Sequence, residues 1–298
     1  MKIWMLPANE DWICDRLVNE FYQFNSDIVT SSINDANIIW LFSDWAWKNV
    51  YRYVVTKKTK VVVTVHHIVP QKFGEVEELE FKMRDAYVTK YHVFNELTYN
   101  QIRNLTNKQI EIIPYWCNQY IWKQTDTKEN LRKIYGINEH KYVIGSFQRD
   151  SEGADVMKPK LEKGPDKLAD FIIQKSKEKN IQVILGGWRR DYLINRLKSQ
   201  NIDFIYFERP TQKVINDLYQ TLDLYPITAR YEGGPQALLE CGLLNVPVIS
   251  TPVGIASQVL SPLAINEDVI KAKPEIPNVE SMKIPQAFSK YREFFQNV

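Results

Sequence analysis

Two glutamates eight positions apart are the residues of this chain whose types and spacing most clearly permit chemistry. Glu232 is followed directly by Gly233, Gly234 and Pro235, and Glu240 lies within the apolar run "ALLECGLLNV". A glycine turn that leads into a helix presents free backbone N–H groups, which bind anions such as phosphate. A carboxylate on that helix can accept two hydrogen bonds from a vicinal diol such as a ribose, each worth about 1.5–3 kcal/mol. This stretch therefore predicts a site for a diphosphate, a ribose and a further hydroxylated group.

The second half of the chain supplies the elements that would hold this stretch. Apolar runs without polar alternation predict strands at 142–148, 181–187, 202–208, 222–228 and 246–251. Helical spacing predicts helices at 165–180, 190–201, 211–222 and 235–245. This alternation predicts a parallel sheet buried on both faces, which binds ligands at the carboxyl ends of its strands. Pro235 would lie in the first turn of the last helix and Glu240 in its second turn.

The first half shows the same alternation less clearly. Strands are expected at 2–6, 36–42, 60–67, 91–95 and 110–116. Helices are expected at 11–24, 44–55, 76–89 and 97–107. A polar segment, 123–141, is expected to contain the hinge, and 285–296 a short closing helix.

The predicted fold class is therefore α/β, with two Rossmann-like, doubly wound domains facing a cleft. The expected domains are 1–125 and 139–282, and the closing helix lies within 283–298.

Composition narrows the class of protein. The 298 residues carry a net charge of +2, so no overall basic field points to nucleic acid. The three cysteines (Cys14, Cys117 and Cys241) have no metal-binding spacing, and their odd number favours reduced thiols in the cytoplasm. The N-terminal residues do not have the pattern of a secretory signal, and no run reaches the roughly 18 apolar residues that span a bilayer. We expect a cytoplasmic protein, with peripheral contact at the inner face of the membrane as an open alternative.

The run "EGGPQALLECGLLNVPVISTPVG" resembles the E-x7-E signature of the retaining glycosyltransferases of family 4, which have the GT-B fold. Cys241 replaces the usual alanine. The resemblance implies a nucleotide-diphosphate sugar donor of the UDP or GDP type, with Glu240 on the ribose and Glu232 near the transferred sugar or its phosphates. It implies a hexosyltransferase of class EC 2.4 that transfers the sugar, with retention, to a glycan or a lipid-linked acceptor.

Three further positions match motifs of that family. "GSFQRD" and "KLEKGPD" resemble its basic loop, in which Arg149 and Lys163 would offset the charge of the leaving diphosphate. "VTVHHIVP" resembles its T-x-H segment and places His66 at a strand end, where it would bind a sugar hydroxyl rather than act as a base. Whether His66 or His67 faces the cleft stays open.

Other positions carry weaker expectations. Gly186 and Gly187 end a strand and would let a ligand approach, while Arg209 lies where the family often contacts the base. Arg189 and Arg190 either reach a phosphate or are solvated. In "IEIIPYWCN" the family's glycine is Trp116, so the backbone of this loop must differ from the usual form.

Two surfaces in the first half have alternative interpretations. Asn9, Glu10 and Asp11 bind acceptor hydroxyls or cap a helix. An aromatic and basic group either forms part of the core or faces a membrane that carries a lipid-linked acceptor. Its residues are Trp40, Trp45, Trp47, Lys48, Tyr51 and Arg52.

No metal-binding cluster appears in the sequence, and GT-B enzymes generally need none, so no cofactor is expected. Two other functions stay open: a nucleotide-sugar 2-epimerase, and a non-catalytic GT-B-like binding protein. The chain length and the altered "YWCN" loop favour the latter, whereas the intact E-x7-E spacing disfavours it. A nucleotide-dependent oxidoreductase is not expected, because no GxGxxG follows an early strand.

Overall fold

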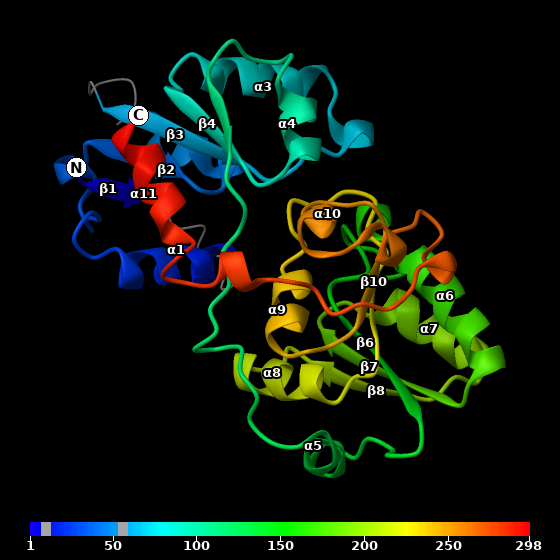
Figure 1. The fold of residues 1–298 in the computed structure, drawn as a ribbon. Helices are drawn as coiled ribbons and strands as arrows, with labels where there is room; N and C mark the ends of the chain where they lie inside the picture. The colour runs from blue at the N-terminus through cyan, green and yellow to red at the C-terminus, as the bar shows by residue number, and fades with distance from the viewer. Residues whose placement is uncertain (7–12, 53–58) are drawn as a thin grey trace. The chain divides into compact units, whose positions relative to one another are not determined.

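The computed structural model describes residues 1–6, 13–52 and 59–298, which form two compact units (Figure 1). The first unit comprises 1–116 and 281–298, and the second comprises 117–280. The sequence placed the corresponding limits at 125–139 and 282–283. The closing segment 281–298 therefore packs with the first unit, and the polar segment 123–141 lies within the second.

The first unit is built on a parallel sheet, as predicted. Its strands run in the spatial order β1-β2-β3-β4-β5. Their bounds are β1 (Ile3–Met5), β2 (Ile38–Leu41), β3 (Lys60–Val65), β4 (Lys90–Val93) and β5 (Ile110–Ile112). Val29 pairs in parallel with Ile3 through a single bridge on the edge of β1 away from β2. The chain thus crosses to one side of β1 and then returns to the other, so the sheet is wound in two directions.

Alternation along the strands gives this sheet two different faces. One face is mainly aliphatic and packs with Trp47, Phe81 and Ile102. The other is aromatic: Trp40 of β2 lies 5.0 Å from Phe21 and 4.8 Å from Phe295, between ring centroids. The helices involved are α1 (Ile13–Phe24), α3 (Glu75–Asp85), α4 (Glu96–Ile102) and α11 (Phe288–Gln296). Helices α1 and α11, far apart in sequence, therefore lie side by side on the aromatic face (Figure 1).

The second unit has a sheet with a reversal of strand order. Strands β6-β7-β8 pair in parallel, β10 pairs with β9, and a bridge between Ile144 and Leu224 joins the two sets. The bounds are β6 (Tyr142–Phe147), β7 (Ile181–Gly187), β8 (Phe204–Glu208), β9 (Tyr225–Ile227) and β10 (Val248–Ser250). The order β10-β9-β6-β7-β8 reverses direction between β6 and β9. Open α/β sheets bind ligands at such a switch point, outside the carboxyl ends of the strands.

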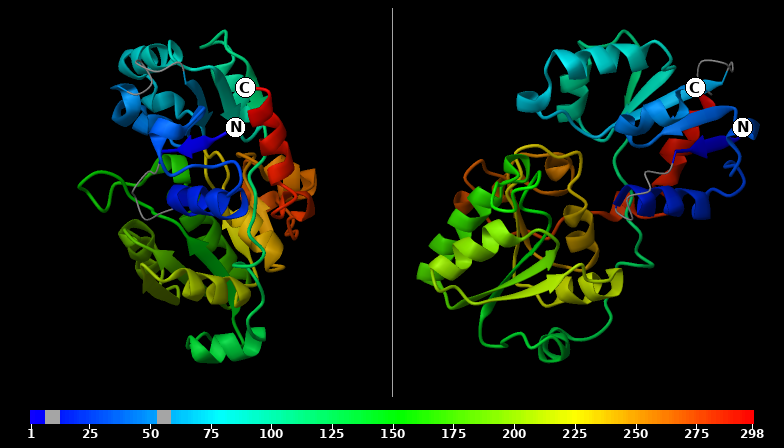
Figure 2. Two further views of the ribbon diagram at one scale, coloured as in Figure 1. Left: turned by 90° about the vertical axis from the view of Figure 1, so that its left-hand side faces the viewer. Right: turned by 180° about the vertical axis from the view of Figure 1, so that it is seen from behind.

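Helices cover both faces of the second sheet. Helices α6 and α7 pack against each other (Figure 2) and bury Leu168 and Leu193 with Val183 of β7. Helix α8 covers the other face. Leu222, just after the end of α8, packs so closely on β6 that a β-carbon on Gly145 would lie 2.2 Å from Leu222 Cδ1. The helices are α5 (Lys128–Ile134), α6 (Pro165–Glu178), α7 (Asp191–Ser199), α8 (Gln212–Gln220), α9 (Ala237–Leu243) and α10 (Ala256–Val259).

Two expectations about helices are corrected. Residues 44–50 form a 3₁₀ helix rather than the start of an α-helix, and 53–55 lie outside the described residues. The polar segment 123–141 contains α5, which begins where the Thr127 side chain accepts a hydrogen bond from the Asn130 backbone N–H. The further 3₁₀ helices are Ile33–Asp35, Pro70–Lys72, Leu161–Lys163, Pro262–Ala264, Val269–Lys271 and Glu280–Met282.

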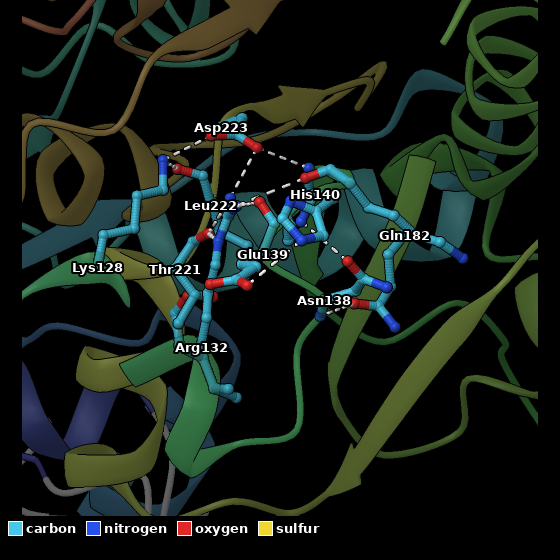
Figure 3. Close-up of polar contacts among 12 residues, drawn as sticks. Lys128, Arg132, Asn138, Glu139, His140, Gln182, Thr221, Leu222 and Asp223 are labelled. Atoms are coloured by element: carbon cyan, nitrogen blue, oxygen red, sulfur yellow. Dashed lines mark hydrogen bonds and ion pairs between the residues drawn. The ribbon is translucent and has the colours of Figure 1, made fainter. Parts of the chain in front are cut away.

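Helix α5 is fixed to the sheet by Asp223, which precedes β9 (Figure 3). Lys128 Nζ and Arg132 Nη2 donate to its two carboxylate oxygens at 2.6 and 2.7 Å, and the Val143 N–H donates at 2.8 Å. Burial alone would raise the pKa of Asp223, but these hydrogen bonds outweigh it and lower the pKa below its usual range. This carboxylate therefore joins α5, β6 and β9 at the end of the sheet opposite the predicted site.

Candidate functional site

The loop that follows β9 contains both glutamates of the motif. Helix α9 begins at Ala237, with Gln236 as its N-cap, so Pro235 precedes the helix instead of lying in its first turn. Glu240 is consequently in the first turn rather than the second. Both residues still lie at the carboxyl end of β9, next to the switch point.

Glu232 is paired with Lys163, which comes from the loop after β6. The Lys163 ammonium forms a salt bridge with the Glu232 carboxylate, and both side chains are largely buried. The preceding loop residues are tied in the same way, because Arg230 donates to both Asp166 oxygens at 2.8 and 2.6 Å. The two loops beside the switch point therefore form one connected structure, and two predicted site residues meet there.

A glycine makes this approach possible. Gly164 has φ +65°, and a β-carbon on it would lie 1.9 Å from the Thr228 carbonyl oxygen. Thr228 Oγ1 donates to the Gly164 carbonyl at 2.8 Å. Any side chain at position 164 would separate the loops and move Lys163 away from Glu232.

Glu240 is buried, and Tyr219 of α8 donates its hydroxyl to Oε2 at 2.8 Å. Burial and then the charge of Glu240 raise the pKa of Tyr219 well above its usual range, so the phenol stays a hydrogen-bond donor. Tyr219 packs in turn against Phe147 and Tyr225, with centroids 4.7 and 5.3 Å away. This aromatic support holds the carboxylate of Glu240 rigidly, as its predicted role requires, although the sequence did not identify Tyr219.

The glycine turn is backed by the loop after β10. The Ile255 N–H donates to the Gly234 carbonyl at 2.7 Å, and a β-carbon on Gly254 would lie 1.7 Å from the same oxygen. Gly233 and Gly234 are both buried in this contact region. Binding of a diphosphate by the backbone N–H groups of Gly233 and Gly234 stays a prediction.

Gln236 is a residue of this loop that sequence reasoning missed. Its side-chain Nε2 is buried, and among the described residues it has no hydrogen-bond partner. Gln236 and Glu240 are four positions apart, so they share one side of the start of α9. A polar residue between two motif glutamates is the signal that could have indicated it.

The residues predicted at the ends of β6, β7 and β8 meet around Trp188. The guanidinium groups of Arg149 and Arg209 lie over its ring, 5.6 and 5.0 Å from the centroid. Gly186 and Gly187 have protein neighbours where a β-carbon would be: Phe147 Cδ1 at 2.8 Å and the Gln148 carbonyl oxygen at 3.2 Å. Their proposed contact with a ligand stays a prediction.

Arg190 is neither solvated nor exposed to a phosphate, in contrast to both expectations. It is fully buried and donates through Nε to Asp150 at 2.8 Å, in an ion pair with no exposed surface. Its other nitrogens donate to Ser146 and to the Gly186 carbonyl at 2.6–2.9 Å. Burial raises the pKa of Asp150, against the lowering effect of Arg190. Arg190 thus connects β6 with β7 beneath the loops.

His66, in the first unit, has both ring nitrogens in protein hydrogen bonds. Nε2 donates to the Phe42 carbonyl at 2.8 Å, so Nδ1 accepts from the Tyr115 hydroxyl at 2.7 Å. Trp116, which replaces the family's glycine, is buried and donates to Glu20 at 2.8 Å. The altered loop therefore supplies a core side chain to this unit. A sugar contact by His66 stays a prediction.

The predicted aromatic and basic surface is smaller than expected. Trp40 and Trp47 are core residues, whereas Trp45 and Tyr51 are exposed. The alternation of β2 explains Trp40, whose side chain points into the aromatic face. Asn9, Glu10 and Asp11 lie outside the described residues.

The described residues contain neither a membrane-spanning helix nor a cluster of metal ligands. None of the helices found there is long and apolar enough to cross a membrane. Likewise, 1–6, 13–52 and 59–298 contain no group of three or more acidic, histidine or cysteine side chains placed to hold a metal ion.

Comparison with known families concerns mainly the second unit. Residues 127–273 match the family model described as "Glycosyl transferases group 1". The matched segment contains the loops after β6 and β9, with Lys163, Glu232 and Glu240. No curated protein matches the chain in sequence.

Solved structures resemble the whole chain. HepE (Alr3699) of Anabaena, solved with UDP and glucose, has a TM-score of 0.79 at 12% identity, covering 100% of this chain and 99% of that one. The lipopolysaccharide outer core galactosyltransferase WaaB has a TM-score of 0.66 at 12% identity, with both chains fully covered. A glycosyltransferase from Rickettsia africae has a TM-score of 0.63 at 13% identity, covering 98% and 83%. At this identity the likeness establishes the fold, which is the GT-B fold predicted from the sequence.

Proposed function

We propose that the protein is a glycosyltransferase that uses a nucleotide-diphosphate sugar. The observation that carries this proposal is the pairing of Lys163 with Glu232 across the switch point, beside the buried carboxylate of Glu240. The match of 127–273 to group 1 glycosyl transferases supports the same conclusion. HepE has been solved in complex with UDP and glucose and with UDP-glucose, which favours a UDP-sugar donor here.

In this proposal each site residue has a defined task. Glu240, held by Tyr219, accepts hydrogen bonds from the ribose hydroxyls. Lys163 and Arg149 offset the negative charge that develops on the leaving diphosphate. Because this charge is largest in the transition state, the two cations accelerate transfer. Glu232 orients Lys163 and contacts the transferred sugar. The Gln236 side-chain Nε2, which is buried without a partner among the described residues, donates to an oxygen of the sugar nucleotide.

The stereochemical course and the acceptor extend the proposal. We propose transfer with retention through a front-face route, in which a donor phosphate oxygen takes the proton of the attacking hydroxyl. The acceptor is a glycan or lipid-linked sugar, with His66 as a contact. The two protein cations supply the charge that a metal ion provides in other transferases, so activity is expected to persist in the presence of a chelator.

Substitution of the two glutamates tests the proposal directly. Glu240→Gln should weaken UDP binding by about 10- to 100-fold, since charged hydrogen bonds to the ribose are lost. Glu232→Gln should lower the rate of transfer more than it lowers the affinity for UDP. Glu267→Gln is the matched control, because Glu267 is an exposed carboxylate of the same unit. Equal and negligible effects of the first two variants, measured by calorimetry and product analysis, would contradict the proposal.

Incubation with donor alone separates the other possibilities. An epimerase changes the sugar nucleotide without any acceptor, and a binding protein leaves it intact under every condition. A transferase forms a glycosidic product only when an acceptor is present, and nuclear magnetic resonance of that product reports its anomeric configuration.

A further inference from the structure

Three arginine side chains from three loops of the second unit surround the indole ring of Trp188. Arg149 follows β6, Arg189 follows β7 and Arg209 follows β8, with guanidinium carbons 5.6, 5.5 and 5.0 Å from the ring centroid. Any two of these carbons are therefore at most about 11 Å apart, close to the distance of about 8 Å over which physiological salt screens charge. We call these four residues the Trp188 cluster.

Within the described residues, no carboxylate neutralises the positive charge of this cluster. Among the residues that the structure describes, none of the three guanidinium groups is paired with a carboxylate. Arg189 donates to neutral oxygens, those of the Ser151 hydroxyl and the Gly153 carbonyl. Guanidinium groups keep their charge, so the three repel one another unless an anion lies between them.

The three loops are held together by backbone hydrogen bonds. The Asp150 N–H donates to the Arg189 carbonyl at 3.2 Å, and the Arg209 N–H donates to the Gly187 carbonyl at 2.9 Å. Arg189 and Arg209 have φ angles of +57° and +43°, a left-handed region that non-glycine residues rarely adopt. The buried ion pair of Arg190 with Asp150 also joins the loop after β6 to the loop after β7. Backbone contacts thus hold the three arginines close together. Non-glycine residues held in such conformations concentrate at functional sites.

The cluster shares Arg149 with the predicted diphosphate site but extends away from Lys163 along the sheet edge. Lys163 and Glu232 belong to the loops after β6 and β9, whereas the cluster extends over β6, β7 and β8. Neighbouring strands are about 4.8 Å apart, so β8 lies three strand spacings from β9. Arg149 therefore lies between the Lys163–Glu232 ion pair and the other two arginines of the cluster.

We propose that the Trp188 cluster binds an anionic group, a carboxylate or a phosphate, in addition to the diphosphate. Guanidinium groups bind such oxyanions through paired N–H donors, and the indole beneath fixes their planes. The proposal rests on the proposed function in one respect, because it assigns the diphosphate to the Lys163 side of the edge. The anionic group either belongs to the sugar nucleotide or is a free oxyanion.

The test measures binding of inorganic phosphate, UDP, UDP-glucose and UDP-glucuronic acid to the full chain by calorimetry at low and high salt. Arg189→Gln should weaken phosphate binding about tenfold or more, and weaken UDP binding at least five times less. Arg189→Lys should restore part of the loss, because it keeps the charge but not the fork of donors. Lys177→Gln, which removes an exposed charge from α6 of the same unit, is the control and should change neither affinity more than twofold.

Two results support the proposal and identify the source of the anion. If the donor carries it, UDP-glucuronic acid binds at least tenfold tighter than UDP-glucose, and Arg189→Gln removes that difference. If the anion is free, phosphate binds to the UDP complex as well as to the free protein, and the two donors bind alike.

Other results overturn it. Phosphate that competes with UDP, with Arg189→Gln weakening both equally, would assign the cluster to the diphosphate site. Phosphate binding that is absent, or unchanged in Arg189→Gln, would make the cluster a structural contact. Failure of the wild-type chain to bind UDP would count against the proposed donor instead, because the phosphate measurement does not depend on it.

Discussion

One buried network in the first sheet and the loops at the carboxyl edge of the second sheet differ in how their polar groups are satisfied. In the first unit, Trp40 Nε1 donates to Thr64 Oγ1 at 2.8 Å, Thr64 donates to His92 Nδ1 at 2.9 Å, and His92 Nε2 donates to the Ile113 carbonyl at 2.9 Å. Every donor in this series of three hydrogen bonds has an acceptor. Burial lowers the pKa of His92 to about 3, which keeps the ring neutral. The network is closed, so it specifies packing rather than binding.

At the carboxyl edge of the second sheet, polar groups retain unused capacity. Gln236 Nε2 is buried without a partner, and the Trp188 cluster has three guanidinium groups without a carboxylate, both within the described part of the chain. Buried polar groups in native proteins are normally satisfied, and exceptions need an explanation. Buried side-chain atoms without a partner also occur among the described residues of the first unit, as at the Tyr91 hydroxyl on β4, so the contrast concerns this network and this edge rather than the two whole units.

The largest expected effect concerns the buried ion pair of Arg190 with Asp150 in the second unit. Arg190→Met should destabilise this unit by about 3–5 kcal/mol, because it leaves the Asp150 carboxylate buried without its cation. Urea unfolding followed by hydrogen exchange of β7 amides measures the loss. The double change Arg190→Met with Asp150→Leu should recover most of it. A single variant as stable as the wild type would show that Asp150 reaches water.

The pH dependence of the first unit tests its closed network. Unfolded His92 takes up a proton near pH 6.5, whereas the folded ring does so only near pH 3. The contribution of His92 to stability is therefore complete above pH 6.5 and falls by about 1.4 kcal/mol per pH unit as the pH decreases toward 3.

Hydrogen exchange of β4 amides should show about 2 kcal/mol less stability at pH 5 than at pH 6.5 from this residue. His92→Gln removes the titration, so the variant should lose correspondingly less over the same range. Equal pH dependence in the two proteins would contradict a sealed, neutral ring.

Gln236→Leu should have opposite effects on stability and on binding. Removing a buried donor without a partner should stabilise the second unit by about 1 kcal/mol, since the desolvation cost disappears. The same change should weaken binding of the donor sugar nucleotide about tenfold, because the proposed hydrogen bond is lost. Thermal unfolding and calorimetry measure the two effects. A variant that loses stability and keeps its affinity would place Gln236 among ordinary structural residues.

The smallest expected effect concerns a solvent-exposed pair. Lys82 and Glu78 form an i, i+4 salt bridge on α3 at 2.6 Å, with both side chains well exposed. Lys82→Ala should change the stability of the first unit by about 0.3–0.5 kcal/mol. A loss above about 1 kcal/mol in chemical unfolding would show that exposed charges matter as much here as the closed network.

Local patterns sufficed for most of the architecture. The parallel sheets and their helices follow from apolar runs and helical spacing, and the GT-B fold predicted from the E-x7-E motif is confirmed. The single bridge at Val29 was not predicted, because one paired residue leaves no alternation to detect. Helix α5 was missed because its polar composition conceals a Thr127 cap and one buried leucine, Leu131.

Prediction of the site was limited by tertiary pairing. The E-x7-E motif identified Glu232 and Glu240, and the basic-loop motif identified Lys163. The structure brings Lys163 and Glu232 together. Tyr219 lies 21 positions before its partner, on a helix whose pattern indicates only amphipathic packing. The role of Trp188 likewise could not be predicted from the sequence, because the three arginines over its ring come from loops that are distant in sequence.

The close contact of Gly164 with Thr228 has a consequence for affinity. Because the loops after β6 and β9 are joined by this contact and by the Arg230–Asp166 fork, neither has to be ordered when a molecule arrives. Immobilising a free side chain on association costs about 0.5–1.5 kcal/mol, and here that entropy is lost during folding instead. A ligand should therefore bind to preformed loops. The lifetime of the complex should then depend on the contacts of the ligand with these loops and not on a loop-opening step.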